Sequence, residues 1–420
     1  MTDDPPGTPA RRAAMRVLDQ VVRKGLPLET ALGRATQALD RADDRAFAHA
    51  IAAEALRRLP DLDALIDSAT QKPIPADAKP RFALRIALVQ ALALETPPHA
   101  AIATVLPLVD GGPRRLVHGV FGALMRRGAT LPSPPALPDP VGLRWQAAWG
   151  NDMIAAAARA IASPPPIDLT LRDPAETAIW AERLGGASLA PGHVRLSGHP
   201  RIAELDGYAE GAWWVQDISA SLPARLAGAG AGRAIDLCAA PGGKTLQLAA
   251  AGWDVTALDL SAPRLDRLRE NLDRTRLSAT IVTANAAAWE PPALAELVLL
   301  DAPCSATGIF RRHPDVLHRV RPRAIAELAQ QQAQLLARAA RMVASGGRLI
   351  YAVCSLEPAE GEGVADAFAE PGFAPDPIAA HELPAGFAPD SEGRLRVLPG
   401  TLADAGGADG FFVARFRRTG

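Results

Sequence analysis

After residue 214 the chain alternates short apolar runs with longer amphipathic stretches, and this rhythm limits the possible fold more than any other feature. Short apolar runs bounded by turn residues are typical of strands buried on both faces, and the stretches between them are long enough for helices. The runs lie at 234–237, 254–258, 279–282, 297–300 and 348–353, and the clearest helical stretches lie at 264–275 and 325–343. The alternation predicts an α/β fold in which helices cover both faces of a parallel sheet.

The N-terminal third of the chain has a different periodicity. Residues 11–128 carry apolar side chains three and four positions apart, as in the stripe formed by Phe47, Ile51 and Ala55. No alternating strand pattern interrupts these stretches. We therefore expect an all-α domain over residues 1–130.

A Pro-rich connector at 129–140 separates this helical part from a mixed region. The mixed region contains a helical stretch followed by the strand-like run 167–171. The pattern predicts a linker and a small α+β module over residues 131–212, and the sheet domain over residues 213–420.

Composition excludes several classes of protein. Lys and Arg total 45 against 46 Asp and Glu, so the net charge of −1 does not by itself indicate a polyanionic partner. The acidic, Pro-rich start lacks the apolar core of a secretory signal, and no apolar run approaches the roughly 18 residues that a membrane span needs. Three widely spaced cysteines suit neither a disulfide framework nor a zinc cluster. We expect no metal site, no membrane association and a cytoplasmic location.

Each of the three cysteines comes shortly after a predicted strand. Cys238 follows the first run, Cys304 comes soon after the fourth, and Cys354 follows the fifth. Ligands of open parallel sheets bind outside the carboxyl ends of the strands. If these strands are neighbours, the three sulfur atoms converge on one crevice, which is the arrangement that a thiol-dependent enzyme needs.

The segment CAAPGGKT joins the first predicted strand to a helix through a glycine-containing turn. Such a turn lets backbone N–H groups approach a ligand and aims a helix N-terminus at it. A phosphate-binding P-loop is excluded, because it needs a glycine five residues before Gly243, where Cys238 stands. Asp259 ends the next strand and can accept both hydroxyls of a ribose, which favours a nucleotide-type ligand over a purely structural turn.

Two further segments combine acids with thiols. DAPCSATG places Asp301 and Cys304 three residues apart, and AVCSLEPAEGE places Cys354 before a group of glutamates. Taken singly, Asp301 could be a helix cap and either cysteine a small buried hydrophobic residue. Enzymes that methylate exocyclic amines carry an aromatic residue where Cys304 stands. A thiol at that position implies that the attacking carbon is not intrinsically nucleophilic.

Together these motifs resemble the signature of the RNA cytosine-5 methyltransferases. CAAPGGKT, DAPCSATGIFRRHPD and CSLEPAEGE carry the resemblance, and GYAEGAWWVQDISA and DGFFVARFRR resemble the start and the last strand of the family's catalytic domain. Residues 10–128 resemble the helical domain of the bacterial enzymes of the family, which is similar to the antitermination factor NusB. The resemblance implies a NusB-like all-α domain and a Rossmann-like class I methyltransferase domain with a mostly parallel, seven-stranded sheet.

The resemblance also implies catalytic roles. Cys354 is the nucleophile that adds to cytosine C6, and Cys304 assists release of the product. Asp301 hydrogen-bonds the N3 edge of the cytosine and stabilises charge as the adduct forms. Cys238 has a structural role at the turn.

The methyl donor that the resemblance implies is S-adenosyl-L-methionine. The residues that it assigns to the cofactor are Cys238, Ala239, Ala240, Pro241, Gly242, Gly243, Lys244, Asp259, Arg264, Asn285 and Asp301. Among them, Asp259 contacts the ribose, Asn285 lies near the adenine and Asp301 lies by the methionine end. Lys244 contacts either the cofactor carboxylate or the RNA.

Three positions depart from the family pattern. Asn285 stands where the family has Asp, Gly361 where it has Asn, and Val353 where it has Thr. None of these changes removes a reacting group, so the resemblance implies an active enzyme.

The implied partner is RNA, specifically small-subunit ribosomal RNA, bound by a monomeric enzyme. The target base must be unpaired or extruded before a thiolate can reach it. Arginines that follow the DAPCSATG loop are expected to hold phosphates beside the site, namely Arg311, Arg312, Arg319, Arg321 and Arg323. Two alternatives remain open: the same chemistry on tRNA, and a non-catalytic RNA-binding or ribosome-assembly module.

Overall fold

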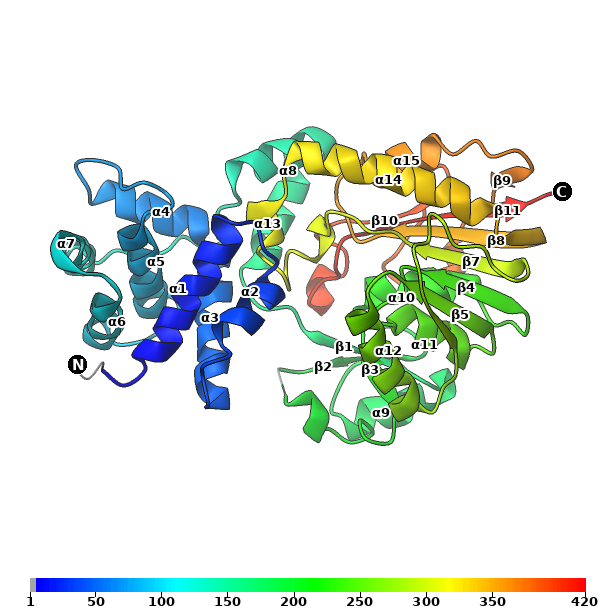
Figure 1. Cartoon of the computed structure of the whole chain (residues 1–420), viewed down its shortest axis with the longest axis horizontal. Helices are drawn as coiled ribbons and strands as arrows, with labels where there is room; N and C mark the ends of the chain where they lie inside the picture. The colour runs from blue at the N-terminus through cyan, green and yellow to red at the C-terminus, as the bar shows by residue number, and fades with distance from the viewer. Residues whose placement is uncertain (1–4, 199) are drawn as a thin grey trace. The chain divides into compact units, whose positions relative to one another are not determined.

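The structure, a computed structural model, describes residues 5–198 and 200–420 and places them in an all-helical unit and a unit built on β-sheets (Figure 1). Unit 1 contains Met1–Pro164 and Phe310–Val320, and unit 2 contains Pro165–Ile309 and Arg321–Gly420. Within the described residues, no helix is both long and apolar enough to cross a membrane. The domain boundaries proposed at 130 and 212 remain a prediction.

Unit 1 is all-α, as predicted. At its centre lies α5 (Lys79–Leu92), where every residue from 81 to 90 is buried. A helix buried on every side needs apolar residues all round, and FALRIALV supplies them except at Arg85, which forms two 2.8 Å hydrogen bonds to Asp63. The other helices of unit 1 are α1 (Thr8–Val22), α2 (Leu28–Ala35), α3 (Ala42–Arg57), α4 (Leu59–Ser68), α6 (Pro98–Val105), α7 (Gly111–Arg126), α8 (Asp139–Ile161) and α13 (Val316–Arg319).

The segment Phe310–Val320 belongs to unit 1, although the residues on both sides of it belong to unit 2. The ring of Phe310 packs edge-on against Trp145 of α8, with ring centroids 5.5 Å apart. The Asp315 carboxylate accepts a hydrogen bond from the Leu28 N–H at the start of α2. Two more contacts fasten the segment to α3: Arg57 donates to the Arg311 carbonyl, and His318 Nε2 lies 2.7 Å from the Leu56 carbonyl oxygen.

Unit 2 begins with a small antiparallel sheet of order β2-β1-β3. Its strands are β1 (Ile167–Leu171), β2 (His193–Leu196) and β3 (Trp213–Val215), and α9 (Thr177–Arg183) packs against β2. Trp180 and Trp213 lie in the core of this α+β module. The module contains the predicted strand 167–171, but the helical stretch that the sequence pattern assigned to it is α8, which belongs to unit 1.

The large sheet of unit 2 has the order β10-β11-β8-β7-β4-β5-β6, and β9 pairs with β11. Its strands are β4 (Arg233–Leu237), β5 (Asp254–Asp259), β6 (Thr280–Thr283), β7 (Ala295–Asp301), β8 (Val343–Val353), β9 (Phe373–Pro375), β10 (Leu395–Val397) and β11 (Phe411–Arg418). Strands β4 to β8 pair in parallel, whereas β9, β10 and β11 pair antiparallel. This topology confirms the predicted Rossmann-like class with a mostly parallel sheet.

Two helical layers cover the faces of the large sheet (Figure 1). The helices concerned are α10 (Ile218–Ala227), α11 (Gly243–Ala250), α12 (Ala262–Thr275), α14 (Pro322–Ala340) and α15 (Glu362–Asp366). In β7, Val298 and Leu300 face α14 and α15, whereas Leu297 and Leu299 face α10 and α11. Both faces are buried, and for this reason the central strands are apolar at nearly every position.

Candidate active site

Sheet order brings the three cysteine-bearing strands side by side. Strands β4, β7 and β8 are consecutive and parallel in the large sheet, so their carboxyl ends lie at one edge. Cys238 directly follows β4, Cys354 directly follows β8, and Cys304 lies three residues past the end of β7. The expected neighbourhood of the three strands is confirmed, and it places all three thiols at the edge where open parallel sheets bind ligands.

Cys304 and Cys354 form a contacting pair of free thiols. Their sulfur atoms are 3.5 Å apart, and both residues are partly exposed. The hydrogen bond to Cys354 raises the pKa of Cys304 well above its ordinary value, and burial and the nearby charge of Glu360 act in the same direction. The Cys304 thiol therefore holds its proton more firmly than a free cysteine does, and either sulfur can be the donor in the contact.

Cys238 has a different environment. Burial, together with the charges of Asp301, Asp259 and Asp236, raises the pKa of its thiol to about 12. A thiol with such a pKa is protonated at neutral pH and is therefore a poor nucleophile. The structural role expected for Cys238 fits this environment.

The turn after β4 has a conformation that requires glycine. Gly242 has a φ of +112°, and a Cβ added there would collide with the side chain of Leu268. Helix α11 begins at the next residue, so its first N–H groups point toward the carboxyl edge of the sheet. Binding of a ligand by the turn that joins Cys238 to Lys244 stays a prediction, and the start of α11 at this edge suits it.

Asp259 lies at the same edge, at the end of β5. Its carboxylate is 4% exposed and accepts hydrogen bonds from the Ala240 N–H at 3.1 Å and the Ser261 N–H at 2.9 Å. The guanidinium of Arg264 lies 3.6 Å from Asp259 and donates to the Ala240 carbonyl. A carboxylate has about four lone-pair positions, so Asp259 can still accept hydrogen bonds from the hydroxyls of a ribose.

Two residues near Asp259 offer contacts to a planar base. Asn285 lies past the end of β6, is exposed, and accepts a hydrogen bond from the Ala287 N–H through its side-chain oxygen. Leu260 directly follows Asp259 and is 73% exposed, which is unusual for a large apolar residue at a strand end. The sequence reasoning missed Leu260, although an apolar residue directly after a strand-end acid was visible in ALDLS.

Lys244 pairs with a carboxylate of the protein, a contact that the sequence did not predict. Its ammonium lies 2.8 Å from the carboxylate of Asp301 and 5.2 Å from the centre of the Phe411 ring. Burial by itself lowers the pKa of Lys244, but the charge and hydrogen bond of Asp301 outweigh it, and the net pKa is raised. Lys244 is therefore charged and orients Asp301 beside the two thiols.

The arginines expected to hold phosphates do not form one group. Arg311 is 3% exposed, and its burial keeps it from RNA, so the expectation is wrong for this residue. Arg319 also belongs to unit 1, where it pairs with Asp315 at 2.8 Å. Arg323 lies on α14 in unit 2, is exposed and pairs with Glu327.

The described residues contain no group of three or more His, Cys, Asp or Glu side chains that could hold a metal ion. The edge brings together two contacting thiols and a carboxylate held by a lysine. Such a set can add to an electron-poor carbon, stabilise the charge that develops and help the sulfur to leave.

Two family models match the chain. The NusB family matches residues 8–121, and 16S rRNA methyltransferase RsmB/F matches residues 225–417. Ribosomal RNA small subunit methyltransferase B of Xylella fastidiosa is 35% identical over 436 aligned positions, which cover 97% of this chain and 98% of that protein. The protein of the same name from Pseudomonas putida is 35% identical over 437 positions, covering 96% and 97%.

Solved structures agree on the fold. The crystal structure of PH0851 aligns with a TM-score of 0.75 at 22% identity, over 97% of this chain and 98% of that one. The structure of NSun6 from Pyrococcus horikoshii with SFG aligns with a TM-score of 0.59 at 17% identity, over 68% and 99%. Together with the family models and the near full-length relatives, the fold confirms the predicted resemblance. The chain belongs to the 16S rRNA methyltransferase RsmB/F family and is an S-adenosylmethionine-dependent RNA methyltransferase.

Proposed function

We propose that this enzyme methylates C5 of an unpaired cytosine in small-subunit ribosomal RNA. The 3.5 Å separation of the Cys304 and Cys354 sulfur atoms carries the proposal, because cytosine C5 becomes nucleophilic after a thiolate has added at C6. The relatives are named for small-subunit ribosomal RNA, which favours this substrate over tRNA. A purely binding module would have no use for a contacting thiol pair at a ligand-binding edge.

Cys354 is the nucleophile in this proposal. Its thiolate forms a bond to C6, and the electron pair of the 5,6 double bond shifts toward C5 and the N3 edge. C5 then takes the methyl group, which is what S-adenosylmethionine supplies when bound. The C5 proton is lost to solvent, the electron pair it leaves re-forms the 5,6 double bond, and Cys354 departs from C6 as a thiolate, so that one proton is released overall.

Asp301 acts at the N3 edge of the base. The 2.8 Å contact with Lys244 fixes the direction of its carboxylate, and the positive charge of Lys244 balances the charge at this position. Cytosine N3 is an acceptor, so this contact needs one proton shared between Asp301 and N3, and that proton offsets the electron density that builds at N3 as the thiolate adds.

Cys304 assists release. Because its proton is retained, it can donate to the sulfur of Cys354 while the bond to C6 breaks. Stabilising the departing thiolate in this way is general acid assistance, and its loss should slow elimination more than addition.

The residues at the carboxyl edge fit the methyl donor. The turn at Gly242 has no room for a Cβ, and its backbone N–H groups point outward. Asp259 has acceptor capacity for ribose hydroxyls, and the exposed side chains of Leu260 and Asn285 suit an adenine. Arg264, close to Asp259, balances the carboxylate charge at this end of the site.

Trapping of a covalent complex tests the proposal. Cys304→Ala should accumulate a denaturant-resistant protein–RNA adduct, because Cys354 still adds but is not helped to leave. Cys354→Ala should give neither adduct nor methyl transfer. Asp366→Asn is the matched control, since its carboxylate pairs with Arg394 at 2.6 Å and belongs to neither thiol loop, and it should methylate like the wild type. Absence of an adduct with Cys304→Ala would refute the roles assigned to Cys354 and Cys304.

The proposal extends to a monomeric enzyme in the cytoplasm, where ribosomal RNA is found. The reacting groups considered above come from one chain, so no second copy is needed for catalysis. Sedimentation velocity with and without RNA tests the monomer. Bisulfite sequencing of cellular RNA with and without the enzyme identifies the modified cytosine, and a site in tRNA instead of ribosomal RNA would refute the substrate assignment.

A further inference from the structure

Glu360 is a buried carboxylate for which the proposed mechanism has no use. It lies in the loop after β8 and is 0% exposed. Its oxygens accept hydrogen bonds from the Ser305 N–H at 2.8 Å, the Ser355 hydroxyl at 2.6 Å and the Gln332 side-chain amide at 3.0 Å. The Ser305 hydroxyl donates to the same carboxylate. A carboxylate, which accepts only, matches this set of donors.

The two serines that bind Glu360 directly follow the two reacting thiols in the sequence. Ser305 follows Cys304 and Ser355 follows Cys354, so one carboxylate ties together the loops that carry both sulfur atoms. The loops are also joined by the backbone, because the Gly308 N–H donates to the Cys354 carbonyl at 3.0 Å.

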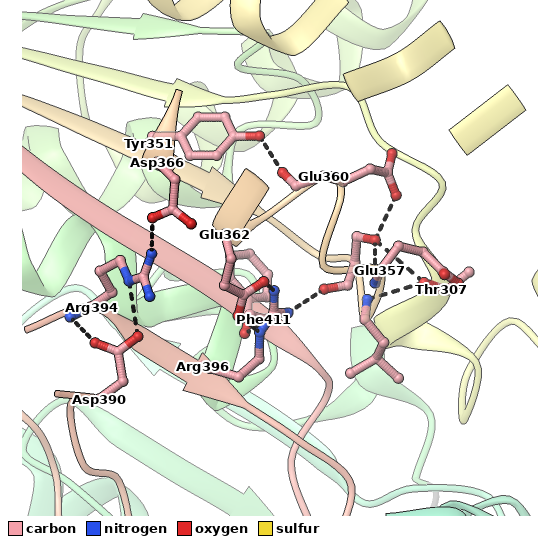
Figure 2. Close-up of polar contacts among 12 residues, drawn as sticks. Thr307, Tyr351, Glu357, Glu360, Glu362, Asp366, Asp390, Arg394, Arg396 and Phe411 are labelled. Carbon is pink, nitrogen blue, oxygen red and sulfur yellow. Dashed lines mark hydrogen bonds and ion pairs between the residues drawn. The ribbon is translucent and has the colours of Figure 1, made fainter. Parts of the chain in front are cut away.

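Glu360 is itself held in place from two further elements. The Tyr351 hydroxyl of β8 donates to the Glu360 carbonyl at 2.5 Å, a contact shown in Figure 2. Gln332 of α14 donates both to Glu360 and, at 2.9 Å, to the Pro303 carbonyl just before Cys304. The carboxylate is therefore the meeting point of the β7 loop, the β8 loop and α14.

We propose that Glu360 is a positioning residue, which holds the two thiol loops at the separation at which Cys304 can donate to Cys354. The inference rests on the proposed function, which assigns the reaction to these two thiols. Without the shared acceptor, Ser305 and Ser355 would each lose a charged partner, and the loops could move independently. A displacement of about 1 Å between reacting groups is enough to slow catalysis about 100-fold.

The charge of Glu360 supports the same arrangement. It lies close enough to Cys304 to oppose ionisation of that thiol, in addition to the hydrogen bond between Cys304 and Cys354 and the effect of burial. A neutral residue at 360 would thus loosen the loops and remove one of the influences that keep the proton on Cys304.

Glu360→Gln tests the inference in the full-length enzyme, with protein-free small-subunit ribosomal RNA and S-adenosylmethionine as substrates. We expect kcat to fall about 100-fold, while KM for RNA changes less than about 3-fold, because RNA binding does not involve Glu360. We also expect an RNA adduct to accumulate with Cys304 intact, since release suffers more than addition. Glu360→Asp keeps the charge and should recover part of the loss in kcat.

Asp366→Asn is the matched control. Asp366 is a carboxylate on the same stretch of chain, and Figure 2 shows it paired with Arg394, at 2.6 Å, in a contact that involves neither serine. This variant should keep kcat and should accumulate no adduct. If Glu360→Gln does not fold, Ser305→Ala provides the same test, because it removes one donor hydroxyl and leaves the carboxylate in place.

The outcomes separate the two proposals. If Cys304→Ala traps no adduct in an otherwise unchanged enzyme, the proposed function fails, whatever Glu360 does. If Cys304→Ala traps RNA but Glu360→Gln keeps wild-type kcat, the positioning role is refuted and the function stands. A fall in kcat without adduct in Glu360→Gln, matched by Asp366→Asn, would likewise refute the positioning role.

Discussion

Replacing Asp236 by Asn should remove a pH-dependent loss of folding stability from unit 2. Asp236 lies in β4, is 0% exposed and accepts a 2.6 Å hydrogen bond from the Thr245 hydroxyl. Its other oxygen has no hydrogen-bond partner among the described residues. Burial raises the pKa of Asp236 from its ordinary value of 3.8 to about 7; the Thr245 hydrogen bond opposes the rise, and the charge of Asp301 adds to it.

The sign of the effect follows from where the proton binds. At pH values between 3.8 and about 7 the folded protein retains a proton on Asp236 that the unfolded chain has released. Stability therefore falls as pH rises through this interval and is constant above it. Each unit of pKa corresponds to about 1.4 kcal/mol, so between pH 5 and pH 8 the wild type should lose about 3 kcal/mol relative to Asp236→Asn. The cost of burying an asparagine amide is the same at both pH values and cancels from this difference.

Urea unfolding at pH 5 and pH 8 measures the difference. The two units need not unfold together, so hydrogen exchange of the β4 and β7 amides should follow unit 2 by itself. The wild type should lose more stability than Asp236→Asn between the two pH values. Equal losses in the two proteins would show that Asp236 is already ionised at pH 5 and would refute the reasoning from burial.

One labelling experiment and two substitutions probe the carboxyl edge of the sheet. Iodoacetamide at pH 8 should leave Cys238 unmodified in the folded protein, because the pKa of its thiol is raised to about 12. Peptide mass spectrometry measures the extent of modification. Modification of Cys238 at the rate of a free thiol would contradict the prediction. Lys244→Met should lower kcat about 100-fold in single-turnover assays because Asp301 loses the partner that orients it, and unchanged kcat would exclude an orienting role. Gly242→Ala should destabilise the turn by about 2 kcal/mol, because φ at this position is +112° and the added Cβ meets Leu268. Calorimetric titration should then show weaker binding of S-adenosylmethionine. Wild-type affinity would argue against this turn as the cofactor site.

The strands were predictable because a strand buried on both faces appears in the sequence as a short apolar run. The run 167–171 matches β1 at both ends, and 234–237 matches β4 to within one residue. Helix α14 was expected to reach residue 343 but ends at Ala340, because Val343 already pairs with Ala295 at the start of β8. Pairing with a neighbouring strand decided this boundary, and the local pattern of apolar residues did not contain that information.

Contacts between distant side chains were not predictable in the same way. Lys244 and Asp301 are 57 positions apart, and Glu360 and Ser305 are 55 apart, so their meeting depends on the order of strands in the sheet. The sequence pattern predicts that the strands are parallel, but it does not say that β4, β7 and β8 are consecutive. The assignment of Phe310–Val320 to unit 1 has the same origin, since its partners lie more than 250 positions away in α2 and α3.

The departure from the family pattern at Gly361 has a structural counterpart in Arg396 of β10. A Cβ at position 361 would collide with the guanidinium of Arg396 and would lie 2.9 Å from the ring of Phe412. The guanidinium that occupies this space pairs with Glu362 at 2.6 Å and donates to the Ser355 carbonyl at 2.5 Å (Figure 2). Arg396 thus fastens the loop of Cys354 from a neighbouring strand. Any side chain at position 361 would require both the Arg396 guanidinium and the Phe412 ring to move, so the glycine at 361 and the present position of Arg396 fit each other.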